Sequence, residues 1–225
     1  MIQRERDQGP VIKTDYRFSE SVGEVLIRRA GTNEAQSVTA NSYLALNDEV
    51  ETKRNSACRI VTSTRTTLDL RPNSTLILTR SDGPDDDGDT HLNLSLNRGL
   101  LDVSTDEARG GEKIFFRKGD IQARIFRNTK AAIDNSGLNL KLRVLHGRIE
   151  VTRDRKEVNL SKNQMLVVKS GEALQQPVDV PAGPKLTKPA NLARFETNQK
   201  GFFPLTLEWD SAEDANLYDL EISKD

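Results

Sequence analysis

Apolar and polar residues alternate with a period of two over much of the chain between Val25 and Val168. Successive side chains of a β-strand point to opposite faces, so this alternation predicts strands that bury one face only. Gly, Asn, Asp and Ser cluster between the alternating runs, where they supply turns with positive φ or side-chain hydrogen bonds. The apolar positions of the expected strands are Val25 and Ile27, Leu68 and Leu70, Leu76 and Leu78, Leu92, Leu94 and Leu96, Ile121, Ala123 and Ile125, Leu138, Leu140, Leu142 and Val144, Ile149 and Val151, Val158 and Leu160, and Leu166 and Val168.

Short, half-buried strands at regular spacing are typical of all-β proteins, and the pattern predicts a sandwich, a barrel or a short solenoid. Composition agrees with this prediction. Only 35% of the 225 residues are hydrophobic and 5% are aromatic. This hydrophobic fraction is below the roughly 45–50% of an average globular protein even when the 14 glycines, which that average includes, are added. We therefore expect a thin core. No apolar run reaches the roughly 18 residues of a spanning helix, and the charged start of the chain predicts no signal peptide.

The region after Ala173 has a different composition. Four prolines in residues 175–191, namely Pro177, Pro181, Pro184 and Pro189, predict a semi-extended linker. Beyond it, residues 192–225 contain two alternating runs, around Trp209 and around Leu220, which are too few strands for an independent core. Either this segment docks on the first domain or the chain stops inside a second domain, and we favour the second alternative.

The net charge of −1 conceals an uneven distribution. Residues 1–108 hold 13 Lys and Arg against 18 Asp and Glu, residues 109–156 hold 13 against 5, and residues 157–225 hold 7 against 11. The three segments therefore carry −5, +8 and −4, which sum to −1. The basic middle is the charge feature most relevant to partners.

The ordered motifs of the first domain resemble the FecR domain, an extracytoplasmic β-rich module of bacterial envelope proteins. The matching stretches are Val22–Ile27, Leu46–Thr52, Leu68–Leu76, Leu96–Val103, Ile125–Ile133, Val144–Val151 and Leu160–Gln164. Asn73, Asn128 and Asn163 stand where the family commonly has glycine. Asparagine tolerates the left-handed region best after glycine, so we expect the turns to be preserved.

The resemblance implies a FecR-like antiparallel or solenoid-type β-sandwich over residues 21–174, preceded by a connector at residues 1–20. The segment from Pro204 to Ser223 resembles the second and third strands of a fibronectin type III domain, which implies a partial domain of that kind over residues 192–225.

The resemblance also implies a periplasmic or cell-envelope location and a scaffold or binding role toward an envelope protein or peptidoglycan. The alternative is a FecR-type transmembrane signalling regulator of a sigma factor. Signalling members continue into a receptor-contacting domain, so the fibronectin-like continuation favours the scaffold. Any membrane attachment would come from an anchor outside this chain. The oligomeric state is left open.

Sites for catalysis, metals or cofactors are not indicated by the sequence, and we expect no enzyme. Cys58 precedes an apolar alternation and is expected to be a buried, unreactive thiol. His91 and His146 lack further residues at ligand spacing, so no metal site is expected. The acidic loop Asp82–Asp89 fails the EF-hand pattern, because aligning Gly88 as the sixth residue puts Gly83 first and Leu94 twelfth. We expect a solvated hairpin tip there, rather than an adventitious calcium site.

The basic segment supplies the candidate functional surface. Residues on the outward faces of its strands, together with neighbours in the turns, would form a cationic stripe if the strands pair: Arg124, Arg127, Lys130, Lys141, Arg143 and Arg148. Such a stripe would attract carboxylated peptidoglycan, phospholipid head groups or an acidic protein. Nucleic acid is not expected, because no aromatic residues interleave on that face. The alternative is that these charges serve solubility and prevent edge pairing.

Overall fold

The computed structural model describes residues 16–39, 42–80, 90–106, 112–180, 185–189 and 205–210. The chain divides into two compact units, residues 1–179 and residues 180–225. The described part is all-β, as predicted. In these segments no helix is long and apolar enough to cross a membrane.

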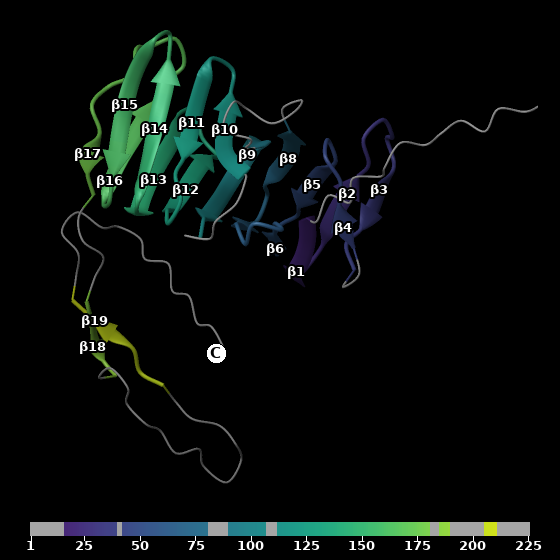
Figure 1. The fold of residues 1–225 in the computed structure, drawn as a ribbon. Coiled ribbons are helices and arrows are strands. Elements are labelled where there is room, and N and C mark those ends of the chain that lie inside the picture. Colours follow the sequence, from purple (N-terminus) through teal and green to yellow (C-terminus); the bar gives the residue numbers. More distant parts are fainter. Residues whose placement is uncertain are drawn as a thin grey trace, which may run out of the picture. The chain divides into compact units, whose positions relative to one another are not determined.

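Residues 16–179 form a β-sandwich of two sheets (Figure 1). Sheet A consists, in pairing order, of β4 (Tyr43–Leu44), β1 (Tyr16–Val22), β6 (Ala57–Val61), β7 (Thr67–Leu70), the second part of β9 (Thr90–Ser104), β12 (Lys130–Asn135), β13 (Leu140–His146), β16 (Gln164–Val168) and β17 (Val178–Asp179). Sheet B consists of β3 (Ala35–Ser37), β2 (Val25–Arg28), β5 (Glu49–Thr52), β8 (Thr75–Arg80), the first part of β9, β10 (Glu112–Lys118), β11 (Ile121–Ile125), β14 (Arg148–Arg153) and β15 (Lys156–Ser161).

The two sheets share the long strand β9. Its residues up to Arg98 pair with β8, and its residues from Gly99 onward pair with β12. Gly99 has a φ of +99°, a conformation that glycine adopts without the steric cost of a Cβ atom. All described pairings are antiparallel except that of β9 with β10, which is parallel. The antiparallel character expected from the sequence is therefore confirmed.

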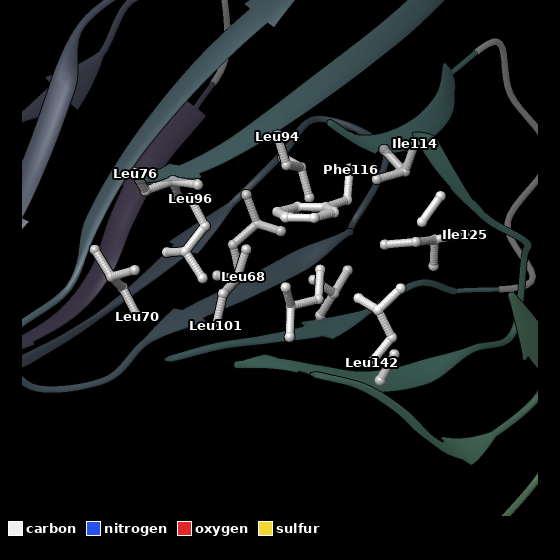
Figure 2. Packing of buried hydrophobic residues seen from close by; sticks show 14 of the residues in the cluster. Leu68, Leu70, Leu76, Leu94, Leu96, Leu101, Ile114, Phe116, Ile125 and Leu142 are labelled. Carbon is white, nitrogen blue, oxygen red and sulfur yellow. The ribbon is translucent and has the colours of Figure 1, made fainter. Parts of the chain in front are cut away.

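The core lies between the sheets and contains every predicted apolar position except Leu138, together with residues outside the predicted runs such as Leu101 and Phe116. Figure 2 shows Leu76, Leu94 and Leu96 of sheet B pointing toward Leu70 and Leu101 of sheet A. Leucine, isoleucine and valine dominate the buried set. Burying one such side chain contributes about 1.5–3 kcal/mol, so the sandwich gains its stability from many medium-sized side chains rather than from aromatic ones.

The chain crosses between the sheets at corners that share one chemical arrangement. At each of three corners a glycine with positive φ lies against a hydroxyl residue that follows an asparagine with positive φ. The residue after the glycine donates its N–H to that hydroxyl. The three bonds are Glu24 N–H to Ser56 Oγ at 2.9 Å, Leu100 N–H to Ser74 Oγ at 3.0 Å, and Arg148 N–H to Thr129 Oγ1 at 3.2 Å.

At two of these corners a threonine hydroxyl forms a further hydrogen bond, to the N–H of the hydroxyl residue. Thr52 Oγ1 accepts the N–H of Ser74 at 3.0 Å, and Thr105 Oγ1 accepts the N–H of Thr129 at 2.9 Å. Each threonine also donates to a carbonyl of the same crossing. Because buried backbone groups are costly when left without a partner, these repeated bonds make the corners rigid.

Some boundaries differ from the sequence-based expectation. Tyr16 and Phe18 fall in the expected connector but are buried in β1, because their alternation with Arg17 begins the first strand. Leu138 was expected in a strand but is 96% exposed, since it lies in the loop that joins β12 to β13. At the other end, Leu174 is buried and β17 extends the first unit to Asp179.

The described part of the second unit contains one short strand pair. In it β18 (Leu186–Lys188), which lies within the expected linker, pairs with β19 (Glu208–Trp209). This pair gives no support to a fibronectin-like arrangement. The predicted strand around Leu220 lies outside the described residues, as does the acidic loop Asp82–Asp89.

Candidate anion-binding pocket

An open pocket of about 750 Å³ lies at the corner of the sandwich where β11 leaves sheet B and β14 enters it. Among the described residues, its lining contains five lysine and arginine side chains and a histidine, with no acidic residue: Lys113, Arg124, Arg127, His146, Arg148 and Lys162. Phe126 and Ser161 also line the pocket. We call this the cationic pocket.

Two arginines converge on Phe126. The guanidinium carbon of Arg124 lies 4.6 Å from the centroid of the Phe126 ring, and that of Arg148 lies 3.9 Å from it. The negative face of an aromatic ring attracts cations, so the ring holds the two guanidinium groups close together despite their mutual repulsion. Glu150 is the register partner of Arg124, but the guanidinium lies over the ring.

The cations of the pocket have few partners of their own. Within the described segments, no ion pair is formed by four of them: Arg124, Arg127, Arg148 and Lys162. A concave site lined by charges of one sign concentrates the electrostatic field. The pocket is therefore complementary to an anion.

The corner formed by Gly147 and Thr129 positions the pocket residues. Asn128 has a φ of +52° and Gly147 a φ of +78°, and these two turns place the end of β11 beside the start of β14. Thr129 is fully buried; its hydroxyl accepts the N–H of Arg148, and it also donates to the Arg127 and Arg148 carbonyls. The N–H of Phe126 donates to the same Arg148 carbonyl at 3.3 Å. The pocket thus rests on a hydrogen-bonded backbone.

The six residues of the expected stripe divide between the sheets. Arg124, Arg127 and Arg148 meet at the cationic pocket, whereas Lys130, Lys141 and Arg143 belong to strands of sheet A. A single stripe would require β11 to pair with β13, but β11 pairs with β10 and β14. The hairpin-by-hairpin alternation between sheets separates the two groups.

In the sheet A group, Lys141 forms an ion pair. Lys141 Nζ lies 3.8 Å from Asp134 Oδ2. Burial raises the pKa of Asp134, but hydrogen bonds from Ser136 and the charge of Lys141 outweigh it and leave the pKa below its ordinary value. The Nε atom of Arg143 is buried and has no hydrogen-bond partner among the described residues.

The sequence did not assign Phe126, Lys113 and Lys162 to the basic surface. Phe126 lies two residues after Arg124, so the alternation of a strand puts both side chains on one face, and this spacing could have predicted their contact. The expectation that nucleic acid does not bind assumed that no aromatic residue lies among these cations, and the position of Phe126 removes that assumption. Lys113 and Lys162 come from β10 and from the turn after β15, so only the strand order could bring them here.

The structure also describes the single cysteine and the surroundings of most acidic residues. Cys58 is a free, buried thiol, as predicted. Desolvation, with a smaller effect of the Asp69 carboxylate, raises its pKa to about 12. No group of three or more His, Cys, Asp and Glu side chains in the described part could hold a metal ion.

Comparison with known proteins gives limited information. No protein-family model matches the chain. No curated protein matches it either. Two crystal structures of a "putative anti-sigma factor" from Parabacteroides distasonis are similar in fold, each with 11% sequence identity and a TM-score of 0.46. In each comparison 59% of this chain matches 59% of the other chain. This likeness is too weak to carry a functional argument.

Proposed function

We propose that residues 16–179 form a non-enzymatic binding module of the bacterial cell envelope, in which the cationic pocket holds a carboxylate-bearing partner. The observation that carries the proposal is the convergence of several cations on one pocket in which no described lining residue is acidic. The extracytoplasmic location rests on the resemblance of the sequence motifs to the FecR domain. The partner would be an envelope protein or peptidoglycan, both of which bear carboxylates.

Arginine suits this role for a chemical reason. Its planar guanidinium offers paired donors that match the two oxygens of a carboxylate. Phe126 adds an apolar surface beside Arg124 and Arg148, so an anionic group attached to a carbon chain or a sugar would gain contact area as well as charge pairing.

A purely solubilising role fits this corner less well than other parts of the surface. Surface charges that serve solubility are normally interspersed in sign. Elsewhere in the sandwich several arginines follow that pattern: Arg28 pairs with Glu49, Arg59 with Asp69, and Arg153 with Asp120. The clustered cations of the pocket repel one another, a cost that an anionic partner would relieve.

A fluorescent, short polyacrylate chain tests the proposal, since it carries carboxylates but no peptide groups. We expect the double variant Arg124→Ala/Arg148→Ala to bind it at least about tenfold more weakly, because charged hydrogen bonds contribute about 1.5–3 kcal/mol each. The matched control is Lys130→Ala/Lys141→Ala, which removes the same charge from sheet A. Equal weakening of both variants, measured by fluorescence anisotropy, would show general electrostatic attraction and reject the pocket.

A sigma-factor regulator is the second candidate, supported by the seven FecR-like motifs in their expected order. In that case the pocket would contact an envelope receptor. Transcript profiling of a deletion strain separates the two functions. A selective change in one sigma-factor regulon would favour the regulator, and unchanged regulons would favour the scaffold.

A further inference from the structure

The strand β15 forms one edge of sheet B. It pairs with β14 over Lys156–Ser161 without any register shift, and no described strand pairs with its other side. The main-chain groups of Arg148, which opposes Ser161, bond to Thr129 and Phe126 instead of to β15. Bonded and non-bonded pairs alternate in an antiparallel ladder. The main chains of Glu157, Asn159 and Ser161 therefore point away from β14.

These outward groups are accessible. Glu157, Asn159 and Ser161 are all exposed. The Ser161 N–H donates to Gln164 Oε1 at 2.9 Å. The main chains of Glu157 and Asn159 make no cross-segment hydrogen bond within the described part of the chain. A row of donors and acceptors is thus open along this edge.

The other described edges of the sandwich are shorter or less regular than β15. At the opposite end of sheet B, β3 has three residues. In sheet A, β4 and β17 have two residues each and cover only part of β1 and β16, and β1 has a register shift between Phe18 and Glu20. Short edge strands are a common protection against unwanted pairing. The six-residue, regular β15 lacks that protection.

The open edge leads directly into the cationic pocket. The chain of β15 runs toward Ser161 and Lys162, and both line the pocket. Side chains of opposed residues share one face of a sheet. A strand added beside β15 would therefore carry alternate side chains on the face that holds Arg148, next to Lys162.

We infer that β15 and the cationic pocket form one docking site for an extended acidic segment of a partner protein. The segment adds antiparallel to β15 as a further strand of sheet B and directs acidic side chains toward Lys162 and Arg148. This inference rests on the proposed function and narrows its partner to a polypeptide. Only a polypeptide has main-chain donors and acceptors that repeat every two residues, about 6.8 Å, as β15 does.

Three blocked hexapeptides with alternating Glu and Thr test the strand pairing: one unmodified, one N-methylated at every Glu, and one N-methylated at every Thr. In antiparallel addition the residues whose side chains share the face of Asn159 also direct their N–H groups to β15. We therefore expect methylation at Glu to weaken binding at least about tenfold, since several hydrogen bonds are lost, and methylation at Thr to change it about twofold or less. Charge and methyl count are the same in both modified peptides.

The variant Asn159→Pro provides an independent test, because proline removes one outward N–H. We expect weaker hexapeptide binding and unchanged polyacrylate binding. Ser37→Pro on β3 is the control, since the Val38 N–H donates to Val25 and Ser37 therefore points its main chain outward as well. Thermal unfolding verifies that each variant is folded.

The outcomes separate the two proposals. Equal binding of the three peptides, or equal loss with both methylated forms, overturns strand addition while polyacrylate binding upholds the pocket. Loss of both ligands in Arg124→Ala/Arg148→Ala with selective loss of the peptide in Asn159→Pro supports the combined site. Absence of polyacrylate binding in the unmodified protein rejects the proposed function itself.

Discussion

Among the described residues, Cys58 has a pKa that is raised well above its ordinary value. It lies in β6 opposite Leu70, and burial raises the pKa of its thiol to about 12. Only the thiolate attacks a disulfide reagent. At pH 8 the folded protein should therefore react with a thiol-specific aromatic disulfide roughly a hundredfold or more slowly than the same protein in denaturant.

Absorbance of the released thiolate measures this difference. The unfolded chain is the internal control, because it contains the same single cysteine. Comparable rates in the two states would show that β6 opens readily and that the thiol is accessible.

Single residues also show what the sequence can predict. Asn73, Asn128 and Asn163 were expected to replace glycine in turns, and their φ values are +56°, +52° and +63° respectively. This local property is readable because few residue types tolerate the left-handed region. Whether each turn joins strands of one sheet or crosses to the other depends on packing across the core, which a local pattern does not contain.

At the level of elements, the hydrogen-bonded corners fix where the chain crosses from one sheet to the other, and so help to fix the order of the strands. A Cβ atom added to Gly147 would lie 2.4 Å from Thr129 Oγ1 and 2.4 Å from the Asn128 carbonyl oxygen. Both neighbours belong to the turn that carries the cationic pocket, so the glycine has a steric role in addition to its conformational one. Gly31 has a similar φ, +76°, but open space around the same position.

The pair Gly31→Ala and Gly147→Ala separates these two effects. Positive φ alone should cost Gly31→Ala roughly 1–2 kcal/mol of unfolding free energy. Gly147→Ala should cost at least about 2 kcal/mol more, because backbone and a buried hydroxyl must move. Chemical denaturation gives both values. Equal destabilisation would mean that the corner relaxes without cost.

The order of the strands in the two sheets is the part of the candidate site that the sequence pattern did not predict. Alternation placed Arg124 and Lys141 on outward faces correctly, since both are on the side opposite the core. It could not reveal that β11 and β13 belong to different sheets, because strand pairs alternate between sheets through the corners. Lys113 and Lys162 reach the pocket by the same long-range arrangement and were missed for that reason.

For the whole molecule, the uneven charge along the sequence becomes a local feature in space. Residues 109–156 carry the excess of +8, yet their described strands contribute to both sheets. In the described part of the chain, cations gather around one pocket where β11, β14 and the turn after β15 meet. Net charge therefore indicates little about partners, whereas the corner geometry selects one surface.

The division of the chain predicts how much of it is needed for a folded sandwich. The first unit ends at Asp179, and its last part closes the sandwich: Leu174 is 2% exposed, and the Lys169 and Glu172 carbonyls accept hydrogen bonds from Arg153. A chain shortened to residues 1–179 should keep its thermal midpoint within about 2 °C. A chain shortened to residues 1–168 should lose about 5 °C or more, because burying Leu174 contributes about 2 kcal/mol and the bonds of Arg153 are lost as well. Circular dichroism at increasing temperature compares the two, and similar midpoints would show that the segment after β16 is not part of the folded unit.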